Sequence, residues 1–228
     1  MTSRPILFAS AAASLAYLLT ADFGATGWRV FLKVASIALL ALLGFRVSKP
    51  LGAALTLGTI GDFLLGVPRL GTFGPEQLFL FGLGAFLCGH LVYIVMFWSC
   101  RRDTMAGPHQ RSTRKQNQLG RSLAILAVVA TLICVLGVLH GSLGPLLVPV
   151  VVYSLVLATM AISAILTDLG DPLAAVGALC FIASDAMLAL AKFNAPFPAS
   201  SALIWITYYA AQLLIFLGVA RGLGTSQA

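Results

Sequence analysis

The sequence predicts an all-α membrane protein built as a single bundle of eight transmembrane helices. Of its 228 residues, 60% are hydrophobic and only 9% are charged, whereas charged residues make up about a quarter of a soluble domain. The apolar residues also form eight runs, each close to the roughly 20 residues with which a helix crosses a bilayer core of about 30 Å. These runs are continuous rather than alternating, which favours helices over the strands of a barrel.

The first run follows the basic residue Arg4. It has features of a signal peptide, but no soluble mature domain follows for such a peptide to export, so we interpret it as a transmembrane helix. The first and third runs lie at the lower limit of length for a span. The predicted helices are 5–20, 28–46, 50–67, 77–99, 119–139, 145–167, 172–192 and 201–220.

Turn-forming residues mark the breaks between these runs. Ser48-Lys49-Pro50 separates the second run from the third, and the stretch from Pro68 to Pro75 separates the third from the fourth. The stretch from Asp168 to Pro172 precedes the seventh run, and Asn194 to Ser201 precedes the eighth. Because no break resembles a long linker, we expect residues 1–228 to form one transmembrane domain.

A basic loop at about 100–120 holds Arg101, Arg102, Arg111 and Arg114. Cytoplasmic loops of membrane proteins are rich in Lys and Arg, which places this loop in the cytoplasm. Both termini then also lie in the cytoplasm, together with most of the 14 Lys and Arg residues. The net charge of +7 is therefore interpreted as a topology signal rather than a nucleic-acid site. Whether the loop also binds a specific lipid or partner stays open, and the compact chain suggests the inner membrane of a bacterium.

Two aspartates lie deep within apolar runs, Asp62 in the third and Asp185 in the seventh. An ionised side chain at that depth costs on the order of 2.5 kcal/mol or more, so it normally has a function. The alternative is a structural polar contact between helices. Both helices start in the cytoplasm in the predicted topology, and a rise of 1.5 Å per residue puts both carboxyls about 18–20 Å along them. We therefore predict that the two aspartates lie at one level and act as a catalytic pair.

Other polar and aromatic side chains within the runs are candidates for substrate binding. Trp205, Tyr208, Tyr209 and Gln212 follow the spacing of one helix face, although such faces are more often simple packing surfaces. A single buried histidine is equally often a hydrogen-bond partner between helices. Together these residues predict a pocket with charged and aromatic walls. The candidates are Lys33, His90, Tyr93, Tyr153, Ser184, Tyr208, Tyr209 and Gln212.

We predict no metal site and no cofactor. Only the two aspartates and His90 are plausible metal ligands, and His90 lies at a different depth. The four cysteines form no CxxC pair and are interpreted as small apolar side chains. A short repeat, Gly61-Asp62-x-x-Leu65 and Ser184-Asp185-x-x-Leu188, is typical of a parallel duplication of four plus four helices.

The chain resembles the YhhN-like lysoplasmalogenase family of multi-pass membrane proteins over nearly its whole length. The most specific run is Gly-Leu-x-x-Phe-x-x-Gly-His-x-x-Tyr from Gly82 to Tyr93. The chain departs from the family pattern at Lys33-Val34, where Lys-Pro is expected. This departure affects the local bend of the helix. The other carrying features are Lys33, Gly61-Asp62, Tyr153, Met160-Ala161, Gly177 to Asp185 and Tyr208-Tyr209-x-x-Gln212.

This resemblance implies hydrolysis of the vinyl ether bond of lysoplasmalogens to a fatty aldehyde and a glycerophosphocholine or glycerophosphoethanolamine. The expected partners are a lysophospholipid within the bilayer and the membrane lipids, and the oligomeric state stays open. Acid–base catalysis by Asp62 and Asp185 suits that chemistry, without a choice of which is the acid. Lys33 is expected either to hold the phosphate or to keep one aspartate charged. The remaining candidates would orient substrate and water.

Two other classes of function stay open at the level of sequence. Buried carboxylates and a lysine in a possibly duplicated bundle also suit a proton- or cation-coupled transporter of small molecules or lipids. The spans lack strong Gly or Pro breaks beside the aspartates, which disfavours that interpretation. The other class is a lipid-binding or scaffold protein without turnover.

Overall fold

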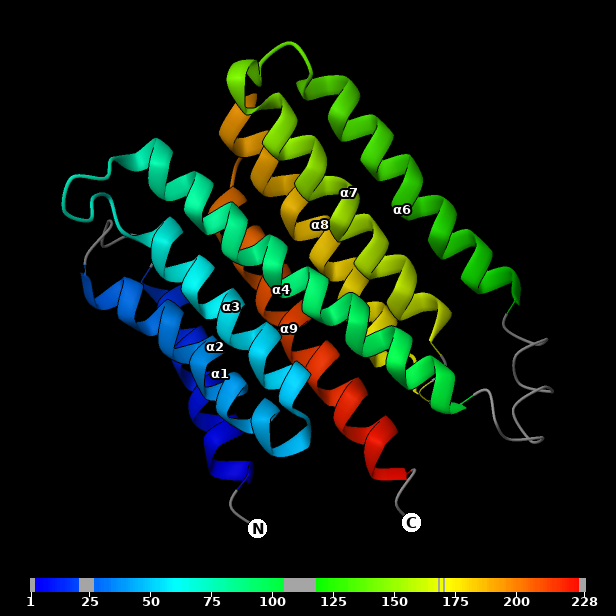
Figure 1. Cartoon of the computed structure of the whole chain (residues 1–228). Coiled ribbons are helices and arrows are strands. Elements are labelled where there is room, and N and C mark those ends of the chain that lie inside the picture. The colour runs from blue at the N-terminus through cyan, green and yellow to red at the C-terminus, as the bar shows by residue number, and fades with distance from the viewer. Residues whose placement is uncertain (1–2, 21–26, 105–117, 168, 170, 226–228) are drawn as a thin grey trace. The chain divides into compact units, whose positions relative to one another are not determined.

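The computed structural model describes residues 3–20, 27–104, 118–167, 169 and 171–225, and its long elements are all helices (Figure 1). Within these residues the only β contact is a single bridge between Leu70 and Phe73. The elements are α1 (Ser3–Leu19), α2 (Gly27–Val47), α3 (Lys49–Gly66), α4 (Pro75–Thr104), α6 (Gln118–Leu139), the 3₁₀ turn η2 (Gly144–Leu146), α7 (Leu147–Leu166), α8 (Leu173–Phe193) and α9 (Ser200–Thr225).

The prediction of an all-helical membrane fold is confirmed, with each predicted run forming a helix. Among the described residues, six helices are long and apolar enough to cross a membrane, namely α2, α4, α6, α8, α9 and the stretch Gly144–Leu166 that contains α7. The apolar helix α1 is shorter, and α3 carries Lys49 and Asp62 within only 18 residues. That all eight cross the membrane, and that both termini are cytoplasmic, stays a prediction. Most of the basic loop lies outside the described residues.

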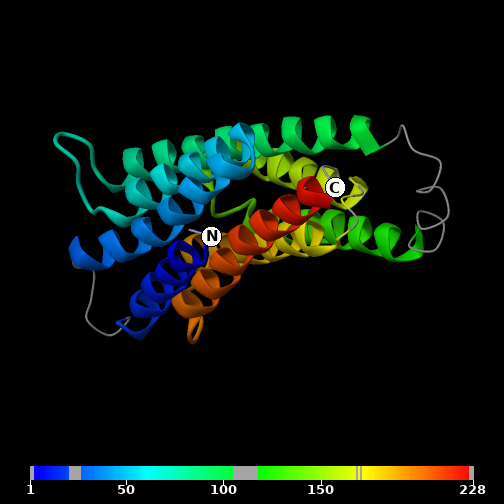
Figure 2. The same ribbon diagram turned by 90° about the horizontal axis from the view of Figure 1, so that it is seen from below.

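The contacts within the chain define two compact units, Met1–Tyr93 and Ile94–Ala228. In the first unit α2 packs against both α1 and α3, and α2 and α3 run side by side in both views (Figures 1 and 2). Only Ser48 separates them. Ser48 has an extended backbone, and its hydroxyl accepts a hydrogen bond from the Leu51 amide at 3.3 Å. Ser48 therefore caps the start of α3 directly after the end of α2. This short connection fixes how the two helices face each other.

Glycines allow close packing between α3 and the first part of α4. A Cβ atom at Gly61 would lie 2.5 Å from the Phe86 ring, and one at Gly82 would lie 2.9 Å from the Leu65 side chain. A Cβ atom at Gly89 would lie 3.3 Å from the Ala54 carbonyl oxygen. Small residues at such positions let helices in a membrane approach closely. The Gly-rich run of α4 therefore packs closely against α3 beside Gly61, the residue directly before Asp62.

In the second unit α8 packs extensively on α9 and also contacts α7 and α6. The α8–α9 pair lies side by side in both views (Figures 1 and 2). A Cβ atom at Gly177 of α8 would lie 2.7 Å from the Ala211 carbonyl oxygen and 2.8 Å from the Ile215 amide nitrogen. These neighbours belong to the backbone of α9, so the close approach requires glycine.

Polar contacts add to this packing at the end of α7. The Trp98 indole donates to the Ser163 hydroxyl at 3.1 Å, and the Thr167 hydroxyl donates to the Phe97 carbonyl at 3.1 Å. Interhelical hydrogen bonds of this kind contribute about 0.6 kcal/mol each in a bilayer. They fix the end of α7 against the last turns of α4 within the second unit.

Candidate active site

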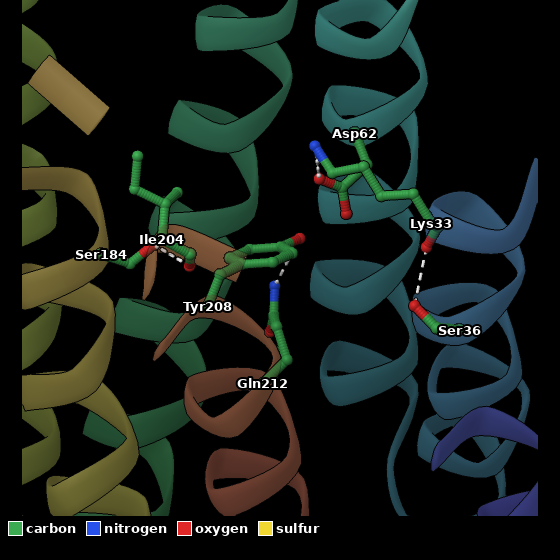
Figure 3. A network of polar contacts seen from close by, with 7 residues as sticks. All are labelled: Lys33, Ser36, Asp62, Ser184, Ile204, Tyr208 and Gln212. Atoms are coloured by element: carbon green, nitrogen blue, oxygen red, sulfur yellow. Dashed lines mark hydrogen bonds and ion pairs between the residues drawn. The ribbon is translucent and has the colours of Figure 1, made fainter. Parts of the chain in front are cut away.

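The first unit holds an ion pair between adjacent helices. The ammonium of Lys33 on α2 lies 3.0 Å from a carboxylate oxygen of Asp62 on α3, and their side chains are 18% and 2% exposed (Figure 3). The Ser36 hydroxyl donates to the Lys33 carbonyl at 2.7 Å and so fixes the helix turn below the lysine. Burial of either charge alone would be costly, and each charge makes burial of the other tolerable. The contact favours the ionised form of Asp62.

Three further side chains of the first unit lie on α4. His90 and Tyr93 are each only 1% exposed, and Phe86 is also buried. Phe86 packs over Gly61, the residue directly before Asp62. The predicted run in α4 therefore places an aromatic ring beside the helix turn that carries the carboxylate. A role of His90 and Tyr93 in binding substrate stays a prediction.

The second unit holds a different polar pair. The Tyr153 hydroxyl on α7 donates to Oδ2 of Asp185 on α8. Tyr153 is 7% exposed, and Asp185 is partly buried. A phenol is neutral and can either donate a proton in a hydrogen bond or accept one, so this partner suits both protonation states of a carboxyl group. The contact fixes one oxygen of Asp185 between two neighbouring helices.

The aromatic face predicted on α9 is present in the same unit. The Gln212 amide donates to the Tyr208 hydroxyl at 3.3 Å (Figure 3), and the Tyr208 ring packs edge-on against Phe181 at 5.5 Å. Trp205 lies 5.6 Å from Tyr208 and 6.2 Å from Tyr209, measured between ring centroids. The Phe181–Tyr208 contact joins α8 to α9, and the other contacts lie within α9.

Ser184 precedes Asp185 on α8, and its hydroxyl donates to the Ile204 carbonyl of α9 at 3.0 Å (Figure 3). It is 1% exposed. This bond orients the helix turn that carries Asp185. The geometry thus gives Ser184 a supporting contact, whereas the sequence suggested a direct role in orienting substrate.

The two polar pairs have corresponding places in the chain. Among the long helices that the structure describes, Lys33 and Asp62 belong to the second and third in chain order, and Tyr153 and Asp185 belong to the sixth and seventh. In each half, therefore, a polar side chain from the preceding helix contacts the carboxyl group. This arrangement fits the predicted duplication of four plus four helices. That the two sets form one pocket stays a prediction.

A further contact was not predicted from the sequence. The guanidinium of Arg29 on α2 lies over the Tyr17 ring of α1, 4.9 Å from its centroid. Arg29 is one helical turn before Lys33, and this i, i+4 spacing was the signal that could have drawn attention to it.

The described residues include no group of three or more His, Cys, Asp or Glu side chains that could hold a metal ion. The polar side chains that do come together form pairs of an acid with a lysine or a tyrosine. Such pairs suit proton transfer and charge stabilisation.

Apolar helices with carboxyl groups held inside them define this chain as an integral multi-pass membrane protein. The model of the YhhN family matches residues 28–219, and the chain belongs to that family. It is 36% identical over 200 residues to a lysoplasmalogenase of Mycobacterium bovis and to one of Mycobacterium tuberculosis, in each case covering 82% of this chain and 69% of the relative.

A mammalian relative is more distant. The chain is 31% identical over 179 residues to the pig (Sus scrofa) protein named lysoplasmalogenase TMEM86B, covering 78% of this chain and 66% of that protein. No solved structure matches this chain significantly. The relatives therefore share a multi-pass family and a named activity, and the residues that perform it must be argued from the geometry above.

Proposed function

We propose that this protein is a lysoplasmalogenase, which hydrolyses the vinyl ether bond of 1-alkenyl lysophospholipids such as lysoplasmenylcholine and lysoplasmenylethanolamine. The observation that carries the proposal is the presence of two carboxyl groups within apolar helices, each held by a polar side chain of the preceding helix. Their retention needs a reason, because ionisable groups are costly in a bilayer. The similarity to named lysoplasmalogenases supplies the reaction.

The reaction begins with transfer of a proton to the alkene carbon remote from the ether oxygen. This step creates an oxocarbenium ion, to which water adds to form a hemiacetal. The hemiacetal then collapses to a fatty aldehyde and a glycerophosphocholine or glycerophosphoethanolamine. One acid must therefore supply a proton, and an anion near the cation lowers the barrier, as in glycoside hydrolysis.

The different partners of the two aspartates suggest different tasks. Asp62 is paired with an ammonium and is assigned the role of the carboxylate that stabilises the cation and activates water. Asp185 contacts a phenol and is assigned the role of the proton donor. Lys33 thereby favours the ionised form of Asp62, whereas Tyr153 holds Asp185 without adding a charge. Tyr208, Tyr209, Gln212, His90 and Tyr93 are proposed to line the path of the substrate.

The test is aldehyde release by the purified protein in detergent from a 1-alkenyl lysophospholipid and from its saturated 1-alkyl analogue. We expect release from the alkenyl lipid alone. Asp62→Asn and Asp185→Asn should each lower kcat by about 10²–10⁴-fold with the helical fold intact. Thr59→Ala is the matched control, since the Thr59 hydroxyl on α3 bonds only to its own helix at the Leu55 carbonyl in the contacts described.

Two results would contradict the proposal. Near-normal turnover by either folded Asp→Asn variant would remove that aspartate from the chemistry. Absence of aldehyde from a well-folded preparation would argue against hydrolysis as a whole. Detergent solution holds no gradient, so turnover there would also separate an enzyme from a coupled transporter.

A further inference from the structure

We propose that the hairpin between α3 and α4, residues 68–74, inserts its apolar face into the lipid interface, where it helps the protein to take lysophospholipid from the bilayer. The part that concerns the substrate rests on the proposed function. The hairpin lies where α3 ends at Gly66 and where the candidate span Pro75–Cys100 begins (Figure 1). The boundary of a span is the level at which lipid head groups lie.

The hairpin has a defined shape. The Leu70 amide donates to the Phe73 carbonyl at 3.2 Å, and the Phe73 amide donates to the Leu70 carbonyl at 3.0 Å. Gly71, in the tight turn between them, has a φ of 58°, which glycine adopts without strain. Residues that exchange both backbone hydrogen bonds point their side chains to the same face of a hairpin. Leu70 and Phe73 therefore form one apolar pair.

This apolar pair is continuous with the exposed surface of a candidate span. Leu70 and Phe73 are each 43% exposed, and the Phe73 ring packs edge-on against Phe81, with 5.2 Å between the ring centroids. Phe81 is 47% exposed and follows Pro75, the first residue of α4, by six positions. This is a rise of about 9 Å along the helix axis. An exposed ring in a span faces lipid, so lipid is also the partner that fits Phe73.

The charge beside the apolar pair agrees with a lipid partner. Arg69 directly precedes Leu70 and is exposed. An arginine at this level can lay its aliphatic part on apolar surface and keep its guanidinium among the head groups. Guanidinium groups also match the oxygens of lipid phosphates. The hairpin thus has the two chemical parts of an interfacial element, an apolar face and a flanking cation.

The depth of the hairpin matters for substrate because the ion pair lies close to it along the chain. Asp62 is four residues before the end of α3 at Gly66, about 6 Å along the helix axis. The end of α3 is packed against α2, since a Cβ atom at Gly66 would lie 3.1 Å from the Val30 side chain. A hairpin in the head-group layer therefore holds the Asp62 carboxyl about one helical turn from that layer. The vinyl ether of a lysophospholipid lies at a similar depth, because only the glycerol separates it from the phosphate.

Insertion is measured by electron paramagnetic resonance on the protein in phosphatidylcholine nanodiscs. A nitroxide on Leu70→Cys, in a background without the native cysteines, reports on the hairpin while Phe73 is kept. We expect this label to be more accessible to oxygen, which concentrates in lipid, than to a water-soluble nickel chelate. Adding Phe73→Ser should shift the label toward the chelate. Glu76→Cys is the matched control, because the exposed Glu76 points about 140° away from Phe81 on α4, and its label should prefer the chelate.

The effect on the proposed reaction is measured in the same nanodiscs and in detergent. Phe73→Ser should raise KM for a 1-alkenyl lysophospholipid in the bilayer by about 3–10-fold. It should leave kcat unchanged, because no reacting group is altered. In detergent, where substrate is not taken from a bilayer, the variant should have the KM of the wild type. Phe73→Trp should keep the wild-type KM in both media, since indoles favour the interface. Phe8→Ser is the control, because Phe8 is 74% exposed on α1 and is not part of the hairpin.

A Leu70 label that prefers the nickel chelate would overturn the inference. Unchanged KM of Phe73→Ser in the bilayer would overturn the role in taking up substrate, and equal rises in bilayer and detergent would indicate a structural role instead. An equal rise for Phe8→Ser would also contradict the inference, because any exposed phenylalanine would then have the same effect. If the Leu70 label lies in lipid but the wild type releases no aldehyde in either medium, the proposed function fails while insertion of the hairpin stands.

Discussion

At the scale of single residues, the chain stabilises two carboxyl groups in an apolar environment by two different chemical means. Asp62 has a full opposite charge at 3.0 Å, and Asp185 has the neutral hydroxyl of Tyr153. A pair of opposite ions is neutral when the carboxyl group is ionised, and a carboxyl–phenol pair is neutral when the carboxyl group is protonated. Because a bilayer favours the neutral state of any group of charges, the two aspartates should differ in protonation.

This difference can be measured by infrared spectroscopy of the detergent-solubilised protein at neutral pH. We expect a carbonyl stretching band of a protonated carboxyl group in the wild type and in Asp62→Asn. The band should disappear in Asp185→Asn, because that variant removes the only carboxyl group to which we assign a proton. Loss of the band in Asp62→Asn, with retention in Asp185→Asn, would reverse the acid and base roles.

At the scale of helices, close packing in the second unit depends on glycines of α8 and α9. Gly177→Ala would place a methyl group 2.7 Å from the Ala211 carbonyl oxygen. Since the obstacle is backbone, the helices must separate, and we expect the variant to lower the free energy of unfolding by about 1–3 kcal/mol. Thermal unfolding in detergent measures this.

Gly137→Ala on α6 provides the control for that substitution. Among the described residues, no atom outside the nearby backbone of α6 lies within 4 Å of the position its methyl group would occupy, so the variant should be neutral or slightly more stable through its higher helix propensity. Equal destabilisation by the two variants would show that close packing of α8 on α9 is not the cause.

The start of α8 and the end of α9 are joined by a pH-sensitive contact. The Leu173 amide donates to one carboxylate oxygen of Asp171 at 2.9 Å, and the Arg221 guanidinium lies 3.1 Å from the other. These bonds hold the pKa of Asp171 below its usual value. A group with a lowered pKa in the folded state stabilises the fold above its ordinary pKa of about 4. That contribution is lost as the pH falls through the lowered value.

We therefore expect the unfolding temperature of the wild type to fall more steeply than that of Asp171→Asn as the solution is acidified below about pH 4. The two proteins should converge at the lowest pH, where Asp171 is protonated in both folded and unfolded chains. Parallel curves over the whole range would mean that this contact does not contribute to stability.

At the scale of the whole molecule, the number of helices that cross the membrane determines on which side each connection lies. If all eight cross, the connection between α2 and α3 lies in the cytoplasm. If α1 and α3 do not cross, it lies outside. Ser48→Cys in a background without the native cysteines should thus react with an impermeant thiol reagent from the cytoplasmic side only. Gly71→Cys is the control, because both arrangements place it outside.

The sequence was sufficient to predict the helices because Pro, Gly and polar residues interrupt the apolar runs sharply. Pro50 falls within the first turn of α3 and Pro75 begins α4, close to the predicted boundaries. The ends of α4 and α9 extend beyond their predicted limits, to Thr104 and Thr225. Hydropathy detects where the apolar part of a helix stops, whereas the backbone hydrogen bonds continue into polar residues.

The candidate site was harder to predict than the helices. The rise per residue predicted one level for Asp62 and Asp185. The contact of Asp62 with Lys33 depends also on how α2 and α3 are rotated about their axes, which composition does not specify. The same limit applies to the Tyr153–Asp185 bond and to Arg29 over Tyr17, which require the packing of neighbouring helices.

The single-residue connection at Ser48 has a consequence for how this family can vary. An inserted or deleted residue there would turn α3 by about 100° relative to α2 and move it by about 1.5 Å along its axis. Asp62 would then face away from Lys33, and both charges would be left in an apolar environment. We therefore expect the length of this connection to be conserved wherever the ion pair is present. We expect natural length variation in this half of the chain to accumulate instead between Pro68 and Pro75, where a longer loop leaves helix rotation unchanged.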